Sequence, residues 1–277
     1  MNDDPITLQE IWTRFDGLRL LYRTNAEPQP SADAQTMIHV HGFAISGRYL
    51  MPTAWRLAPE YRTFVPDLPG FGRSQHPRHP LSIPELADAL ARFMDHVEVD
   101  RATLMGNSLG CPITAEFVAR HPDRIERAIF VSPAGGRHNR PIYKGVAQLV
   151  VAGLREPLGM APIAIEDYLR YGLIATWDLL RSMFAYNTAE RLAGMTLPTL
   201  VVIGSRDPLV SEEVVRREAP KLPHVTAVSI DGAAHAINFS HPQQLANVVN
   251  AYMKGLPLVD DPTTKGRLRI ISLPREA

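Results

Sequence analysis

A serine placed between two glycines is the first feature of this chain that could do chemistry. The pentapeptide Gly-Asn-Ser-Leu-Gly at 106–110 follows an apolar run at 102–105 and precedes a stretch with helical apolar spacing at 111–120. A Gly-x-Ser-x-Gly sequence between a strand and a helix predicts a sharp turn, which strains the serine backbone and exposes its hydroxyl above the sheet. Ser108 then lies at a helix N-terminus, where free amides and the helix dipole stabilise a developing anion. We predict that Ser108 is a nucleophile.

A serine nucleophile needs a base and an acid, and polar residues after two later apolar strands are candidates for these roles. Asp207 ends the polar turn after the run Val201–Ile203, which places it at the carboxyl end of a strand. His235 follows another strand, in a loop of small residues at 232–234. We predict that His235 is the base and that Asp207 orients its imidazole. Asp231 is the rival for the second role because it is nearer His235 in the sequence.

The negative charge that forms when a hydroxyl attacks a carbonyl must be stabilised by hydrogen-bond donors. An apolar strand at 36–40 runs into a glycine turn, His-Gly-Phe, at 41–43. This turn offers the backbone amide of Phe43, which could pair with the amide of Leu109 beside the nucleophile. We therefore expect Phe43 and Leu109 to form an oxyanion hole.

Five segments, in this order along the chain, resemble those of the α/β-hydrolase superfamily, and in particular serine hydrolases that carry a helical cap. The resemblance spans roughly residues 36–250. It implies an α/β fold with a mostly parallel central sheet flanked by helices, an inserted helical cap, and a triad in the order Ser, Asp, His. Esterases and hydrolases of meta-cleavage products, which break carbon–carbon bonds, both resemble the chain. The segments are His41-Gly42-Phe43, Asp67-Leu68-Pro69-Gly70-Phe71-Gly72-Arg73-Ser74, the pentapeptide around Ser108, Gly204-Ser205-Arg206-Asp207 and Gly232-Ala233-Ala234-His235.

The pattern of apolar residues indicates the elements that must position these groups. Two short strands open the chain and are joined at Asp16-Gly17, a turn dipeptide that commonly closes hairpins. Further strands then alternate with helices, which indicates a mostly parallel sheet with helices on both faces. We assign the hydrolase core to residues 1–134 and 193–255. The predicted strands are 11–15, 18–23, 36–40, 62–66, 102–105, 128–131, 199–203 and 226–230.

Residues 135–192 interrupt the alternation, and we interpret them as a helical cap over the active-site edge. Helices are predicted at 165–173 and 176–186, with breaks at three prolines, Pro141, Pro157 and Pro162. Side chains of the second helix are candidates for a mostly apolar substrate pocket, although at helical spacing they cannot all face one cavity. These candidates are Trp177, Arg181, Met183, Phe184 and Tyr186. The tail, 256–277, has no place in the family pattern and is expected either to be disordered or to add an edge strand.

Composition excludes some classes of function. The 277 residues include 29 Lys plus Arg and 29 Asp plus Glu, so no overall charge favours nucleic acid or an anionic membrane. The acidic start at 1–5 and the absence of an apolar run near the roughly 18 residues of a membrane span predict neither export nor insertion. A single cysteine fits a reducing, cytoplasmic setting. We expect a small-molecule substrate and no metal or organic cofactor; the oligomeric state stays open.

The bond that is cleaved is less well determined than the catalytic groups. Carbon–carbon hydrolases of this kind usually have a glycine after the pentapeptide and a tryptophan after the histidine, where this chain has Cys111 and Ala236. These differences favour hydrolysis of a carboxylic ester, lactone or thioester over cleavage of a vinylogous diketone, which stays the alternative. A non-catalytic ligand-binding protein is a third reading. We interpret Asp67 as part of a structural turn and Cys111 as a small buried residue.

Overall fold

A computed structural model describes residues 8–27, 30–31, 33–135, 139–193, 196–222 and 224–274. The acidic start at 1–5 and the last residues of the tail, 275–277, lie outside the described residues. Within the described ranges, no helix is both long enough and apolar enough to cross a lipid bilayer.

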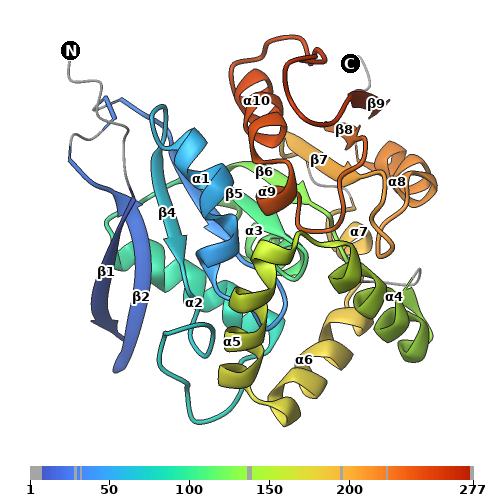
Figure 1. The fold of residues 1–277 in the computed structure, drawn as a ribbon. Coiled ribbons are helices and arrows are strands. Elements are labelled where there is room, and N and C mark those ends of the chain that lie inside the picture. The colour runs from blue at the N-terminus through green and yellow to red at the C-terminus, as the bar shows by residue number, and fades with distance from the viewer. Residues whose placement is uncertain are drawn as a thin grey trace.

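The described chain forms one nine-stranded sheet in the order β1-β2-β4-β3-β5-β6-β7-β8-β9 (Figure 1). The six central strands run parallel, whereas β1, β2 and β9 pair antiparallel with their neighbours. The fold class predicted from the sequence is therefore confirmed. The strands are β1 Leu8–Phe15, β2 Leu18–Asn25, β3 Thr36–Val40, β4 Arg62–Pro66, β5 Ala102–Asn107, β6 Ile125–Val131, β7 Thr199–Gly204, β8 Val225–Ile230 and β9 Leu268–Ser272.

Both ends of the sheet follow from local sequence. Asp16 and Gly17 have positive φ angles, 52° and 73°, so the two-residue turn between β1 and β2 has the twist that a tight hairpin requires. At the other end, β9 pairs with β8 from Ala227 to Ile230. Of the two alternatives for the tail, the structure shows the edge strand.

Helices cover both faces of the sheet, and the alternation of side chains along each strand builds two cores. On β6, Phe130 packs in the core under α2 and α3, whereas Ile129 points to the core under α1 and α10. Because helices cover both faces of the sheet, side chains on both sides of the central strands are mostly apolar and buried. The helices of the two layers are α1 Met51–Leu57, α2 Ile83–His96, α3 Gly110–Arg120, α8 Glu212–Glu218, α9 Ile237–Ser240 and α10 Pro242–Met253, with short 3-10 turns at η1 Gly47–Leu50, η2 Pro122–Arg124 and η5 Ala219–Lys221.

Between β6 and β7 the chain leaves the sheet and forms a group of helices at the lower part of Figure 1. Pro141 and Pro157 precede helical segments as expected, but Pro162 lies in the first turn of α5 and does not break it. A proline fits there because the first turn lacks internal amide partners, so this helix begins earlier than the sequence predicts. The segments are α4 Ile142–Arg155, η4 Leu158–Met160, α5 Ala161–Tyr171, α6 Leu173–Ala185 and α7 Thr188–Arg191.

Polar contacts at several places attach these helices to the core, among them those of two buried carboxylates. Asp167 on α5 is buried and accepts hydrogen bonds from the backbone amide and hydroxyl of Ser46, at 2.8 and 2.6 Å. Near α7, the buried carboxylate of Glu116 accepts from Tyr186 Oη at 2.8 Å and Arg191 Nε at 2.9 Å. Charge-assisted hydrogen bonds of this kind are stronger than neutral ones, so they fix where the segment lies.

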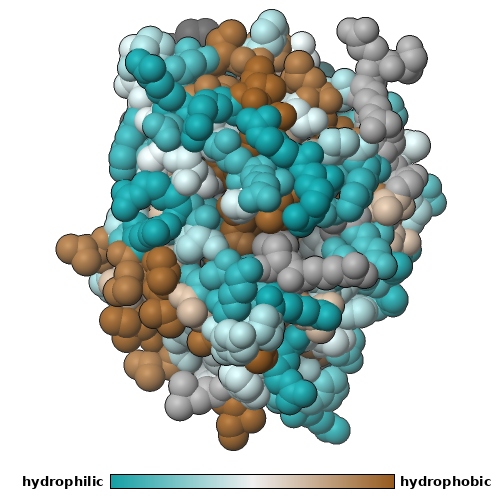
Figure 2. Space-filling model, turned by 90° about the vertical axis from the view of Figure 1, so that its right-hand side faces the viewer, coloured by the Kyte–Doolittle hydropathy of each residue, from teal (hydrophilic) through white to brown (hydrophobic). Residues whose placement is uncertain are grey.

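Large apolar side chains are nevertheless left exposed on this segment. Figure 2 shows an apolar area at the lower left of the face that it presents. Much of this area lies at the height of the helices between β6 and β7. The exposed apolar residues of these helices and the short turns beside them are Tyr143, Val150, Val151, Leu154, Leu158, Ile165, Leu169, Ile174 and Trp177.

Candidate active site

Ser108 lies in the sharp turn between β5 and α3, with a φ angle of 55°. Residues with a Cβ seldom adopt this left-handed conformation, so the backbone at Ser108 is strained. The flanking glycines are required by space. A Cβ on Gly106 would lie 2.3 Å from the backbone oxygen of Gly110, and a Cβ on Gly110 would lie 2.2 Å from that of Val40. The sequence therefore forms this turn because only glycine fits on either side of the serine.

His235 and Asp207 come together from the loops that follow β8 and β7. The Nδ1 of His235 donates a hydrogen bond of 2.8 Å to Oδ2 of Asp207. The other carboxylate oxygen, Oδ1, accepts the backbone amide of Leu209 at 2.8 Å. Because both oxygens of Asp207 are held, the imidazole is fixed with its proton on Nδ1 and its Nε2 free to accept.

The electrostatics of this pair suit a base. Burial by itself lowers the pKa of His235, but the charge and hydrogen bond of Asp207, together with the charge of Glu156, raise it above its usual value. The Nε2 atom is buried and has no hydrogen-bond partner among the described residues. His235 can therefore take a proton from a group in the cavity that it faces.

Asp231, the rival for the acid's position, points elsewhere. Its carboxylate accepts the hydroxyl of Ser205 at 2.9 Å and lies 3.5 Å from the guanidinium of Arg269 on β9. It is exposed at the surface of the molecule. The structure thus brings Asp207, and not Asp231, to His235.

The two amides expected to stabilise an oxyanion also lie near Ser108. Phe43 follows β3, and Leu109 comes directly before α3. In the described part of the chain, neither backbone amide donates a hydrogen bond. Buried amides are normally paired, so a pair without acceptors beside a strained serine has the character of an anion site.

Ser108 and His235 line one cavity of about 250 Å³. Phe43 and Ile45 contribute one wall from the loop after β3, and Leu149, Ala152, Ala164 and Tyr168 contribute another from α4 and α5. The wall is mostly apolar, which is typical of a site for a neutral organic group.

Comparison with known proteins agrees with this fold. A family model described as the alpha/beta hydrolase fold matches residues 35–159. A pimeloyl-(acyl-carrier protein) methyl ester esterase from Xanthomonas campestris pv. campestris is 29% identical over 260 residues, which cover 80% of this chain and 96% of that protein. These matches support an esterase-type hydrolase of the α/β-hydrolase superfamily.

Solved structures show the same fold for nearly the whole hydrolase. A bacterial membrane phospholipase A superposes with a TM-score of 0.77 and 23% identity, covering 90% of this chain and 86% of that one. A carboxylesterase from Bacillus subtilis superposes with a TM-score of 0.71 and 21% identity, covering 91% and 93%. At such identities the likeness establishes the fold alone.

The structure places the five residues expected in the substrate pocket of this hydrolase outside the cavity of Ser108. Met183 and Phe184 lie on the face of α6 that is buried in the core, and the Tyr186 hydroxyl donates a hydrogen bond to Glu116. Trp177 and Arg181 are exposed. Apolar residues on a helix indicate that one face is covered, but they do not indicate which neighbour covers it. The cavity wall that sequence reasoning missed comes from α4 and the start of α5.

Asp67 and Cys111 make structural contacts and do not line the cavity of Ser108. Asp67 is buried after β4, where it accepts Arg23 Nη1 at 2.9 Å and the amide of Gly47 at 2.8 Å, and it does not line the cavity. Cys111 is buried, and its thiol donates to the backbone oxygens of Gly106 and Val131. Burial raises the pKa of this thiol well above its usual value, so it stays protonated and unreactive.

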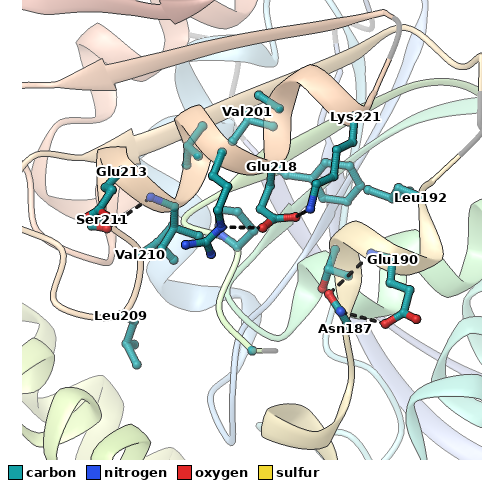
Figure 3. Close-up of a pocket in the computed structure, with 18 of the residues that line it drawn as sticks. Asn187, Glu190, Leu192, Val201, Leu209, Val210, Ser211, Glu213, Glu218 and Lys221 are labelled. Carbon is teal, nitrogen blue, oxygen red and sulfur yellow. Dashed lines mark hydrogen bonds and ion pairs between the residues drawn. The ribbon is translucent and has the colours of Figure 1, made fainter. Parts of the chain in front are cut away.

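A second hollow, larger at about 930 Å³, lies between α7 and α8, away from Ser108 and His235 (Figure 3). Some charged and polar groups in its wall are paired with one another. Glu218 lies 2.6 Å from Lys221 Nζ, and Asn187 Nδ2 donates to Glu190 at 2.8 Å. Thr188 Oγ1 also lines the hollow and is buried without a partner among the described residues, but a neutral hydroxyl is a far weaker base than the imidazole of His235.

Proposed function

We propose that this hydrolase cleaves carboxylic esters through a covalent acyl-enzyme on Ser108. His235 Nε2 takes the hydroxyl proton as Ser108 Oγ attacks the ester carbonyl, while Asp207 stabilises the imidazolium. The oxyanion accepts hydrogen bonds from the amides of Phe43 and Leu109. The tetrahedral intermediate then expels the alcohol, which receives the proton from His235. Water, deprotonated by the same histidine, attacks the acyl-enzyme and releases the acid.

One observation carries this proposal. The bond between His235 and Asp207 leaves Nε2 without a partner in the cavity that also contains the strained Ser108. A base with a fixed tautomer, facing a serine at a helix N-terminus, is the arrangement that serine acyl transfer requires.

The mostly apolar cavity favours a substrate whose larger part is a neutral acyl group. Its walls are apolar, so burying a methylene chain there is favourable by about 0.8 kcal/mol per methylene. The relative from Xanthomonas campestris is named a methyl ester esterase, which supports a small alkoxy leaving group. We further propose that residues 135–192 act as a cap that sets acyl specificity, because α4 and α5 form one wall of the cavity.

A fluorophosphonate probe followed by intact-mass analysis tests the nucleophile. We expect one adduct on the wild type and none on Ser108→Ala. An adduct that survives in the variant would reject Ser108 as the nucleophile.

A substrate panel tests the bond that is cleaved. It comprises p-nitrophenyl esters of increasing chain length, a methyl ester of a medium-chain acid, a lactone and a vinylogous diketone, each assayed with wild type and Ser108→Ala. We expect serine-dependent cleavage of the esters to exceed that of the diketone. Faster serine-dependent cleavage of the diketone than of every ester would replace the ester proposal with carbon–carbon hydrolysis.

A further inference from the structure

Glu156 directly follows α4 and contacts the loop that carries His235. Its Oε1 accepts a hydrogen bond of 2.8 Å from the backbone amide of Ala236, the residue directly after His235. Its Oε2 is buried and has no partner among the described residues. Glu156 also lines the cavity of Ser108. A carboxylate thus lies in a mostly apolar wall, close to the proposed base.

The neighbouring residue makes a matching contact with the other loop. Arg155 Nη1 donates a hydrogen bond of 2.7 Å to the backbone oxygen of Arg206, which directly precedes Asp207. The last two residues of this helical region therefore hold the peptide groups next to both members of the His235–Asp207 pair. Neither contact involves the side chain of His235 or Asp207 directly.

A buried carboxylate is costly unless something compensates it, because burial disfavours the charged form. Burial raises the pKa of Glu156, while the amide of Ala236 and the charge of His235 oppose that rise. The amide and the imidazolium thus stabilise the carboxylate, and the carboxylate in turn stabilises the imidazolium. This reciprocity gives the contact a role in the chemistry as well as in packing.

The charged groups that act on His235 are few. Asp207 approaches Nδ1 from the loop after β7, and Glu156 approaches from α4. Tyr49 and Tyr168, which line the same cavity, have pKa values raised by burial and stay neutral at ordinary pH. Glu156 is accordingly the second negative charge that the imidazolium meets.

We propose that Glu156 is a positioning residue for the reaction, which clamps the His235 loop from α4 and supports the imidazolium that forms as Ser108 attacks. The inference rests on the proposed function of Ser108 and His235. It assigns two separable effects to one side chain: a hydrogen bond to the amide of Ala236, and a negative charge near His235.

Three variants separate these effects. Glu156→Gln keeps an oxygen that can accept from Ala236 and removes the charge, whereas Glu156→Ala removes both. Glu166→Gln is the matched control: Glu166 is a surface carboxylate on α5 that pairs with Arg48 and Arg170 and does not line the cavity. Thermal melts of all three variants establish that each is folded before the other measurements are interpreted.

The first readout is the pKa of His235, followed by NMR of labelled histidine in a Ser108→Ala background and assigned by the signal missing in His235→Asn. We expect a lower pKa in Glu156→Gln and no change in Glu166→Gln. An unchanged pKa in Glu156→Gln would overturn the electrostatic part of the proposal. This measurement needs no turnover, so it stands even if the protein hydrolyses no ester and the proposed function fails.

The second readout is the pH dependence of kcat/KM for a p-nitrophenyl ester. Neutral His235 is the active form, so a lower pKa moves the acid limb of the profile to lower pH in Glu156→Gln. Glu156→Ala should lose about tenfold to a hundredfold in kcat, because a small misplacement of the base is costly, with a smaller change in KM. Glu156→Gln should recover part of that loss. Wild-type kcat in Glu156→Ala, or equal kcat in the two variants, would overturn the clamp.

Discussion

Replacing Asp207 with asparagine is expected to move the imidazole proton of His235 from Nδ1 to Nε2 while leaving the fold intact. Oδ1 of Asp207 accepts the amide of Leu209 and Oδ2 accepts Nδ1 of His235, each at 2.8 Å. An asparagine that keeps the first bond must present its NH₂ group to Nδ1. The imidazole then accepts at Nδ1 and carries its proton on Nε2, where it can no longer take the proton of Ser108.

The expected loss in kcat for Asp207→Asn is on the order of 10⁴, the usual cost of the wrong tautomer in a serine hydrolase. At about 1.4 kcal/mol per tenfold, this corresponds to about 5 kcal/mol of transition-state stabilisation. The assay is the steady-state hydrolysis of a p-nitrophenyl ester, with thermal melts to show that the variant is folded. Asp231→Asn is the control, since Asp231 pairs with Ser205 and Arg269, and it should stay within about threefold of wild type. A folded Asp207→Asn that kept more than a tenth of the activity, or an equal loss in both variants, would refute this reasoning.

Three further perturbations test packing, pH dependence and specificity. Gly110→Ala places a Cβ 2.2 Å from a backbone oxygen of β3 and should destabilise the protein by about 1–3 kcal/mol or more, whereas Gly153→Ala on α4 meets open space and should be neutral or slightly stabilising; urea unfolding of both variants checks this. Burial lowers the pKa of His39 to about 4, below its unfolded value, so the unfolded chain binds the proton first and stability falls as pH drops from about 6.5 towards 4. His39→Leu should remove on the order of 2 kcal/mol of the stability difference between pH 7 and pH 5, and equal pH dependence in both proteins would contradict the assignment. Ala164→Phe narrows the cavity and should lower kcat/KM for a long-chain ester more than for an acetate, whereas Trp177→Ala should leave the ratio of these two kcat/KM values unchanged. The reverse pattern would indicate that α6, and not α5, determines the acyl specificity.

The sheet could be predicted because its signals are local. Runs such as 36–40 and 62–66 are rich in apolar and β-branched residues, and the structure places β3 and β4 at those bounds. Carboxyl ends of neighbouring parallel strands meet at one edge, so the loops containing Ser108, Asp207 and His235 were predicted to converge.

Interactions between the helices of residues 135–192 and the core could not be predicted in the same way. An apolar stripe on a helix indicates that one of its faces is buried, but not what buries it. Phe184 is buried, and it packs against the core instead of lining the substrate cavity. Glu156 carries no local signal at all, because its meaning depends on Ala236, which lies far along the chain. Asp207 was predicted over Asp231 from its position at the end of a strand, but only the structure shows that the loop after β7 turns this carboxylate towards His235.

The three groups proposed to act together come from loops after β5, β7 and β8, and this arrangement has a consequence for how the protein reaches its active form. The N-terminal half of the chain contains Ser108 and the sharp turn that carries it, but neither Asp207 nor His235. Pairing of distant parallel strands is slow, because the entropy of closing long loops must be overcome before the contacts form. Helical circular dichroism should therefore return early during refolding, whereas labelling by an active-site probe should return only when β8 has joined the sheet. Reactivity of Ser108 is thus a measure of whether the whole sheet has assembled.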